Sequence, residues 1–202
     1  MSSLNELNGQ IAQCRKCDIA RQRNKVVPGE GAEDADILFI GEAPGYYEDI
    51  QGRPFVGQAG QFLDQLLASI NLDRTKVFIA NVIKCRPPGN RDPLPTEIQN
   101  CRPWLDRQIE ILKPRMIVTL GRYSMGMYFP GKTISKIHGT AMQRDGIIYF
   151  AMYHPAAALH QRNLQEAIEA DMKKIPQVLA STPPQAAGEQ PPESQQLDMF
   201  EV

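Results

Sequence analysis

Ala35-Asp36-Ile37-Leu38-Phe39-Ile40 ends in an apolar run, and Gly41 follows it directly. A short apolar run closed by a glycine is typical of a buried strand with a loop at its carboxyl end. Three further runs resemble it, at residues 77–80, 116–120 and 147–152. Helical patterns flank and separate them, at residues 2–13, 61–70, 95–112 and 164–179. This alternation predicts an α/β sandwich around a mainly parallel sheet.

Small or polar residues follow the expected strands. Gly41, Asn81 and His154 each come at or just after the end of an apolar run. Ligands bind beyond the carboxyl ends of parallel strands, so these three residues are expected to share one cleft. Taken singly, each has a structural interpretation as well. The glycine loop can be a turn, Asn81 can cap the next turn, and His154 can be a hydrogen-bonding group of the fold.

The composition indicates one ordinary globular domain. The chain of 202 residues is 42% apolar and 22% charged, which fits a single hydrophobic core. No apolar run approaches the roughly 20 residues that cross a bilayer. The polar first ten residues lack the apolar core of a signal peptide, so we expect a cytoplasmic, bacterial protein with no membrane partner.

The chain is expected to divide into a domain at residues 1–180 and a disordered tail at residues 181–202. The tail is rich in Pro, Gln, Ala and Glu and shows no periodicity. It holds four acidic residues and no basic one, so the rest of the chain is net positive although the total charge is −1. A local basic patch is enough to contact a few phosphates, and basic residues gather at Lys84, Arg86, Arg91 and Arg102.

The chain has four cysteines: Cys14, Cys17, Cys85 and Cys101. Disulfides are rare in a reducing compartment, so a metal site is the better interpretation of this even set. Cys14 and Cys17 share one tight turn, and Cys101 lies on an expected helix that could fold back onto Cys85. Four thiolates suit either a tetrahedral zinc or a 4Fe–4S cluster, and the spacing alone leaves both open.

Several separate motifs occur in order along the chain. They are Gly41-Glu42-Ala43-Pro44-Gly45 with Glu48-Asp49, Gly52-Arg53-Pro54-Phe55-Val56-Gly57, Asn81-Val82-Ile83-Lys84-Cys85-Arg86-Pro87-Pro88-Gly89-Asn90-Arg91, and His154-Pro155-Ala156-Ala157-Ala158-Leu159. With these motifs and the cysteine spacing, residues 10 to about 180 closely resemble the family 4 uracil-DNA glycosylases. The resemblance implies a 4Fe–4S cluster rather than zinc, and a central four-stranded parallel sheet between layers of helices.

The resemblance also implies roles for the cleft residues. Phe55 would stack on a uracil flipped out of DNA, and Asn81 would pair with its O4 and N3 and so reject cytosine. His154 would donate to O2, where negative charge gathers as the base leaves; one such donor is typically worth ~3–4 kcal/mol. Backbone amides around Gly41 and Ala43 would add further donors.

The sequence departs from the best-known branch of this superfamily at two positions. That branch positions water with an aspartate where this chain has Ala43, so Glu42 and Asn90 are the candidates here. It blocks the methyl group of thymine with a tyrosine where this chain has Gly45, which leaves Glu48 as the candidate. A related branch traps DNA covalently through a histidine in an Arg-rich inserted loop. No such loop is found in this sequence, so covalent trapping of DNA is not expected. The motifs place no lysine as an amine nucleophile, so a monofunctional enzyme that leaves an abasic site is expected.

The expected partner of a monomeric enzyme is uracil-containing DNA. Ala156 to Leu159 would enter the minor groove, with Ala158 or Leu159 filling the gap left by uracil; simple packing is the alternative. Two other functions are open. A glycosylase of broader range would also release hypoxanthine or other deaminated bases, whereas a non-catalytic DNA-binding module with a metal cluster would leave no abasic product.

The end of the tail resembles the short peptide by which bacterial proteins bind the sliding clamp. Its residues are Gln196, Leu197, Asp198, Met199 and Phe200. Large apolar side chains gain nothing by clustering in a solvated tail, whereas in a groove they act as anchors, with Gln196 supplying hydrogen bonds. The alternative is a tail end that packs on its own domain or has no role.

Overall fold

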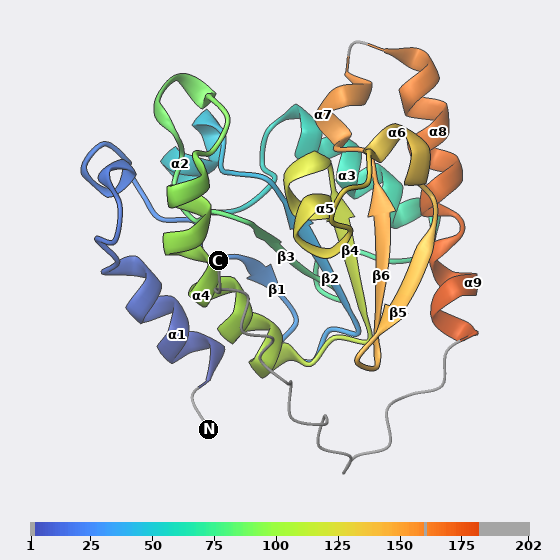
Figure 1. Cartoon of the computed structure of the whole chain (residues 1–202), viewed down its shortest axis with the longest axis horizontal. Helices are drawn as coiled ribbons and strands as arrows, with labels where there is room; N and C mark the ends of the chain where they lie inside the picture. Colours follow the sequence, from blue (N-terminus) through green and yellow to red (C-terminus); the bar gives the residue numbers. More distant parts are fainter. Residues whose placement is uncertain (1–2, 160, 182–202) are drawn as a thin grey trace, which may run out of the picture.

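A computed structural model describes residues 3–159 and 161–181 of the chain. The described residues form one sheet of six strands: β1 (Glu30–Gly31), β2 (Ile37–Gly41), β3 (Phe78–Asn81), β4 (Met116–Leu120), β5 (Ala141–Arg144) and β6 (Ile147–Met152). Their order across the sheet is β1-β3-β2-β4-β6-β5, and Figure 1 shows helices on either side of it. The α/β class predicted from the alternation is confirmed.

The expectation of four strands is wrong for the sheet as a whole. The four strands predicted from the sequence are its neighbours β3, β2, β4 and β6, and each pairs with the next in parallel. Two antiparallel strands, β1 and β5, add an edge on either side. β1 has two residues and β5 is largely exposed, so neither shows the apolar run of a buried strand. Asp145-Gly146, with positive φ at both residues, turns β5 into β6; this dipeptide is a hairpin signal that the apolar pattern alone misses.

The helices are α1 (Leu4–Ala12), α2 (Tyr46–Gln51), α3 (Gln58–Ser69), α4 (Pro95–Leu112), α5 (Arg122–Tyr128), α6 (Ile134–Ile137), α7 (Pro155–Ala158), α8 (Arg162–Met172) and α9 (Ile175–Ala180), with short 3₁₀ turns at Asp18–Arg21 and Pro88–Asn90. They cover two separate apolar cores. Leu38 and Ile40 of β2 join the core that includes residues of α1 and α4, whereas Ile37 and Phe39 join the core under α3 and α8. Successive side chains of β2 point to opposite faces of the sheet, so each face has its own apolar core. The sheet and the helices over its two faces make three layers.

The single helix expected at residues 164–179 is two helices. α8 ends at Met172 and α9 begins at Ile175, with Pro176 in its first turn. Proline is favoured in the first turn of a helix, where its missing N–H needs no partner, so Pro176 favours a new helix start here. It does not by itself end a helix, since α4 continues through Pro103.

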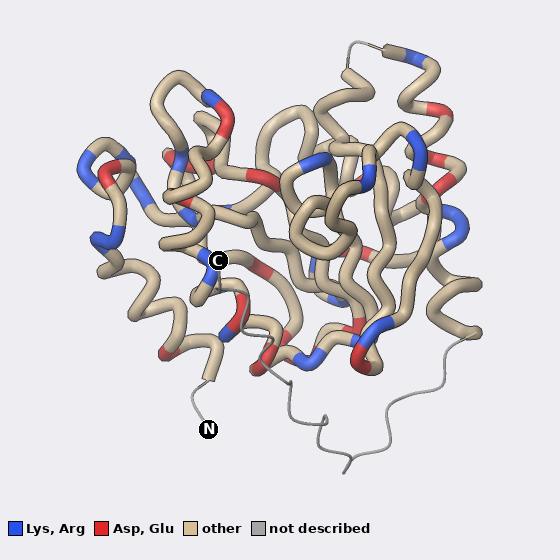
Figure 2. Tube along the Cα trace, viewed as in Figure 1, with Lys and Arg blue, Asp and Glu red and all other residues tan. Residues whose placement is uncertain are grey.

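The strand register brings the expected cleft residues to one edge. Gly41 at the end of β2 is the direct neighbour of Asn81 at the end of β3, and Leu120 pairs with Met152 just before His154. Basic and acidic residues are interspersed along the chain in the view of Figure 2, so no broad single-sign face appears from this side. None of the described helices is both long enough and apolar enough to span a bilayer.

Candidate active site

A cavity of about 390 Å³ lies at the carboxyl edge of the parallel strands. Residues predicted from separate motifs line it together: Ala43, Glu48, Phe55, Asn81, His154 and Leu159. They come from the loop after β2, from α2, from the loop before α3, from the end of β3 and from the segment after β6. Of the three residues expected to share a cleft, Asn81 and His154 line this cavity, whereas Gly41 lies behind its wall against Asn81 and Phe55.

Asn81 lines this cavity and carries an unused hydrogen-bond acceptor. Its side chain is 2% exposed, and its Oδ1 atom has no partner in the described part of the chain. A Cβ atom on Gly41 would lie 2.7 Å from two carbons of the Phe55 ring and closer still to Asn81 Oδ1. Gly41 is therefore required where the two side chains meet. A buried amide oxygen without a partner costs about 1–3 kcal/mol, which a ligand N–H can recover.

Phe55 is held in a conformation that non-glycine residues rarely adopt. Its φ is 52° and its side chain is 5% exposed. Arg74 donates to the Phe55 carbonyl and, at 2.9 Å, to the Pro54 carbonyl, while its Nε atom lies 2.6 Å from Asp64 Oδ1. Gly60 of α3 packs directly against the Phe55 carbonyl. Such strain persists where surrounding groups enforce it, and here they fix the ring in the cavity wall.

His154 is a neutral hydrogen-bond donor. Burial lowers the pKa of His154 to about 4, so the imidazole is uncharged near neutral pH. The backbone N–H of Ala156 donates to its Nδ1 atom at 3.1 Å, so the ring proton is assigned to Nε2. The ring stacks with Phe55 at 5.4 Å between centroids and an interplanar angle of 26°. The arrangement supplies an N–H donor beside an aromatic face.

Glu48 connects α2 to the Phe55 loop. Its Oε1 atom accepts from the backbone N–H groups of Val56 at 3.2 Å and Gly57 at 3.4 Å. A Cβ atom on Gly45 would lie 2.7 Å from Glu48 Oε2. The carboxylate therefore occupies the space next to Gly45. At this position the best-known branch of the superfamily that the sequence resembles has a tyrosine.

Glu42 and Asn90 lie outside the set of residues that lines the cavity. Burial raises the pKa of Glu42, and the nearby Asp92 carboxylate adds to that shift while Arg122 opposes it. The Asn90 Oδ1 atom accepts from Arg86 Nε at 2.6 Å on an exposed loop. Asn90 thus has a partner on the surface, whereas Glu42 is a half-buried carboxylate at the edge of β2.

Ala158 and Leu159 differ in exposure. Ala158 is 8% exposed and belongs to the core under α3, whereas Leu159, at the end of α7, is 39% exposed and lines the cavity. Leu159 is the one of the two whose side chain is free to enter another molecule.

The four cysteines are free thiols, and no three described Cys, His, Asp or Glu side chains are grouped closely enough to hold a single metal ion. Three of their sulfurs accept hydrogen bonds, although burial raises the pKa of the Cys85 thiol and raises that of Cys101 to about 11. Arg23 Nη1 donates to Cys85 Sγ at 3.0 Å, the Lys84 N–H donates to Cys101 Sγ at 3.2 Å, and Trp104 Nε1 donates to Cys14 Sγ at 3.3 Å. Hydrogen bonds to sulfur from N–H donors are those that tune thiolates bound to iron.

Lys84 links this cysteine region to the cavity. The side chain is 1% exposed, and its Nζ atom donates to the Asn81 carbonyl at 2.9 Å and to Gln108 Oε1 at 2.6 Å. Both partners are neutral. Burial lowers the pKa of Lys84 to about 8, and Cys101 and Cys85 oppose that shift. A buried ammonium is strongly disfavoured without negative charge nearby, and anionic sulfur would supply it.

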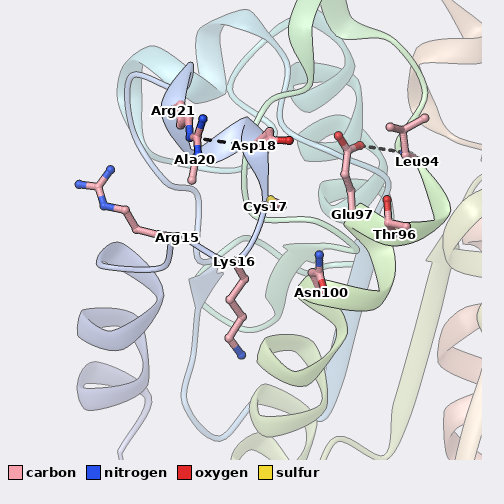
Figure 3. A pocket seen from close by; sticks show the side chains of 10 residues that line it. All are labelled: Arg15, Lys16, Cys17, Asp18, Ala20, Arg21, Leu94, Thr96, Glu97 and Asn100. Carbon is pink, nitrogen blue, oxygen red and sulfur yellow. Dashed lines mark hydrogen bonds and ion pairs between the residues drawn. The ribbon is translucent and has the colours of Figure 1, made fainter.

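A second cavity, of about 420 Å³, lies where the Cys17 turn faces the first turns of α4. Figure 3 shows Cys17 between Lys16 and Asp18 on one side of it and Thr96, Glu97 and Asn100 on the other. Arg15 and Arg21 also line it, so the cysteine turn carries basic side chains at the surface.

Comparison with known proteins assigns this fold and cavity to a class. The family model described as Uracil DNA glycosylase superfamily matches residues 28–177, and the chain belongs to that superfamily. Three relatives narrow the assignment, each called "Type-4 uracil-DNA glycosylase". The protein of Sulfurisphaera tokodaii is 48% identical over 91% of this chain and 87% of its own length. That of Archaeoglobus fulgidus is 45% identical over 91% and 97%, and that of Thermotoga maritima is 39% identical over 82% and 88%.

Sequence patterns miss two residues that support the site, Arg74 and Gly60, which lie outside the strand ends that draw attention to Asn81 and His154. The expectation that Lys84 belongs to a phosphate-contacting basic patch is wrong, because its side chain is 1% exposed and bonded inside the fold. Lys84 carries a signal, because a lysine in the apolar and cysteine-containing stretch 82–85 is unusual. Arg74 and Gly60 carry none, since their partners are backbone atoms set by the tertiary fold.

Proposed function

We propose the following reaction for this chain, which is a DNA-repair uracil glycosylase: uracil is flipped out of DNA, bound in the 390 Å³ cavity and released by hydrolysis of its N-glycosidic bond. The product is an intact abasic site. The observation that carries the proposal is the buried, unpartnered Asn81 Oδ1 atom, which lies in one cavity with Phe55 and His154.

Recognition rests on Asn81 and Phe55. The Asn81 Oδ1 atom would accept the N3–H of uracil, and its amide N–H would donate to O4. Cytosine reverses this pattern, since it has an unprotonated N3 and an amino group at the same positions. Phe55 would stack on the base, and its fixed backbone supports that role because the ring needs no reordering when uracil enters.

His154 would act on the leaving group. As the glycosidic bond breaks, the electron pair moves onto uracil, and negative charge grows at O2. A neutral imidazole with its proton on Nε2 can donate a hydrogen bond there without first gaining a proton. Backbone N–H groups at Gly41 to Ala43 would add donors. The interaction strengthens as charge develops, so it lowers the barrier rather than only tightening binding.

Water must reach the sugar carbon that uracil leaves. Of the candidates, Glu42 is favoured by a raised pKa, which makes its carboxylate a better proton acceptor. Asn90 would serve only after it releases Arg86. Glu48, beside Gly45, would exclude the methyl group of thymine from the cavity.

The experiment is excision from a U:G duplex under single-turnover conditions, with His154→Ala and Asn81→Asp as variants. His154→Ala is expected to reduce the rate by about 100- to 1,000-fold, which corresponds to the loss of one transition-state donor. Wild-type protein that leaves no alkali-labile abasic site would overturn the proposal, as would a His154→Ala variant at full rate. Strand cleavage without alkali would refute the monofunctional mechanism.

Cys14, Cys17, Cys85 and Cys101 are proposed to hold a 4Fe–4S cluster. The three N–H···S hydrogen bonds and the buried Lys84 support anionic sulfur here. The cluster would tie the N-terminal segment to the Cys85 loop after β3 and to α4, and so act as a structural element. A brown protein with about four irons per chain is expected; a colourless, fully active protein loaded with zinc would overturn this assignment.

Residues 181–202 are proposed to form a disordered tail on the domain of residues 1–180, with Gln196, Leu197, Met199 and Phe200 binding the bacterial sliding clamp. These four residues lie outside the described part of the chain. The sequence alone supports the proposal, as it does those of a monomer and a cytoplasmic location. A peptide of residues 190–202 is expected to bind the clamp in an anisotropy assay; equal binding by a peptide with Leu197→Ala and Phe200→Ala would overturn it.

A further inference from the structure

A groove of about 400 Å³ lies next to the uracil cavity, and the reaction described above does not use its glutamines. Four glutamine side chains contribute to its walls: Gln58, Gln61 and Gln65 of α3 and Gln165 of α8. Phe62, 9% exposed, provides an apolar surface, and Ala158 and Leu159 close one side. None of the described residues that line the groove is charged. It is a polar but uncharged surface at the junction of α3, α7 and α8 (Figure 1).

The α3 glutamines form one row with free hydrogen-bonding groups. Their spacing of three and four residues puts them on the same face of the helix. In the described ranges no residue makes a hydrogen bond to the amides of Gln58, Gln61 or Gln65, whereas Gln165 donates to Glu169 at 2.9 Å. Each free amide offers a carbonyl acceptor and an N–H₂ donor. The groove can thus bind a ligand that presents both kinds of group.

The position of Leu159 indicates which ligand the groove would bind. Its side chain lines both the uracil cavity and the glutamine groove, and so does Gln58. If Leu159 fills the gap left by a flipped uracil, as proposed for its exposed side chain, the base pair is split at this side chain. Uracil then lies on one side of Leu159, and its former pairing partner faces the other. The position of the glutamine groove is therefore that of the complementary strand.

We propose that Gln61 and Gln65 bind the complementary strand opposite uracil through the minor-groove edges of its bases. This inference rests on the proposed insertion of Leu159. Every base offers an acceptor at this edge, either N3 of a purine or O2 of a pyrimidine, and a glutamine N–H₂ group can donate to any of them. Guanine adds an amino donor at N2, which a glutamine carbonyl can accept. The groove therefore favours duplex over single-stranded substrate, and guanine over adenine opposite uracil.

An uncharged groove suits this role. Lysines and arginines bind phosphates without regard to sequence, and they would hold either strand equally well. Amides gain little from phosphate charge but read base edges, so they act only where a complementary strand is present. U:G pairs are the products of cytosine deamination, which makes guanine the partner that a uracil-repair enzyme must meet.

The test compares full-length wild-type protein with Gln61→Ala, Gln65→Ala and the double variant. Substrates are one uracil-containing oligonucleotide as a single strand, as a U:A duplex and as a U:G duplex. Both side chains are exposed, so the variants should fold normally. Each change should raise KM on U:G about fivefold, as expected for one hydrogen bond, with a smaller rise on U:A and none on the single strand. Gln177→Ala, on α9, is the matched control for an exposed glutamine and should change nothing.

Equal losses on single strand and duplex would overturn the proposal, because the groove would then hold the damaged strand. Unchanged KM on all three substrates would overturn it as well. The Leu159→Ala variant distinguishes failure of the glutamine proposal from failure of the Leu159 insertion on which it rests. If that variant excises from duplexes at the wild-type rate, insertion of Leu159 is wrong, whereas a duplex-specific loss in the glutamine variants would still support the groove.

Discussion

Replacing Gly60 with alanine should disable the enzyme from a position that never touches uracil. A Cβ atom there would lie 2.9 Å from Phe55 Cα and closer still to the Phe55 carbonyl group. Carbon atoms in contact are separated by about 3.5–4.0 Å, so α3 and the Phe55 segment must part by at least ~0.6 Å. The contact is with backbone, which cannot rotate away as a flexible side chain does. Phe55, already at φ 52° and held by Arg74, has no alternative rotamer that relieves it.

The expected result is a loss of excision rate larger than the loss of stability. Overpacking typically destabilises a protein by about 1–3 kcal/mol. Displacement of a positioning group by about 1 Å can reduce a rate about 100-fold. Single-turnover excision and urea unfolding measure the two effects on the same preparation. The matched control is Gly9→Ala in α1, where a Cβ meets nothing within 4 Å and helix propensity should raise stability by up to about 1 kcal/mol. A Gly60→Ala enzyme that excises uracil at the wild-type rate would refute the reasoning.

Four further outcomes are expected. Asn81→Asp should increase excision of cytosine relative to uracil, because a carboxylate cannot donate to O4; unchanged selectivity, measured on paired oligonucleotides, would remove Asn81 from base reading. Arg74→Met should lower the excision rate because two carbonyls of the Phe55 loop lose their donor, and an unaltered rate would contradict that role. His154 has a pKa of about 4 in the folded protein against an ordinary 6.5, so its contribution to stability is complete above pH 6.5 and is lost as pH falls toward 4. Urea unfolding should therefore give a lower free energy of unfolding at pH 5 than at pH 7, and His154→Gln should make this decrease smaller. A decrease of the same size in the variant would contradict the buried, neutral state of His154. Cys85→Ala should destabilise the fold together with activity, and full iron content by metal analysis in that variant would exclude Cys85 as a ligand.

The sequence predicts the centre of the fold because burial on both faces leaves a clear mark. The apolar runs ending at Ile40, Leu120 and Met152 are each strands of the parallel core. The edge strands β1 and β5 are not predicted, because a strand with one neighbour needs no such apolar run, as the sequence of β5 illustrates. α9 is not predicted as a separate helix, because Pro176 favours a new helix start without interrupting the apolar spacing.

The candidate site, like the fold, is predicted from the sequence only in part. Asn81 and His154 come together because they lie at or just after the ends of strands in one sheet whose register is fixed, and strand ends are visible in sequence. Phe55 joins them from the loop before α3. What holds them in place is not visible. Arg74 reaches the Phe55 loop across 19 residues, and Gln108 reaches the Lys84 side chain across 24. Such contacts depend on packing of helices against loops, for which one sequence has no periodic signal.

The unpartnered oxygen of Asn81 has a consequence after the bond is cut. The cavity is formed before any ligand enters, and its buried acceptor is satisfied only when an N–H group arrives. Free uracil carries the same N3–H group as uracil in DNA. If uracil binds Asn81 as proposed, leaving the cavity would strip a hydrogen bond from a buried acceptor, and departure of the base would be slowed by the feature that selects it. Retention of product, as well as chemistry, would then limit turnover, and accumulated uracil would compete with the next lesion.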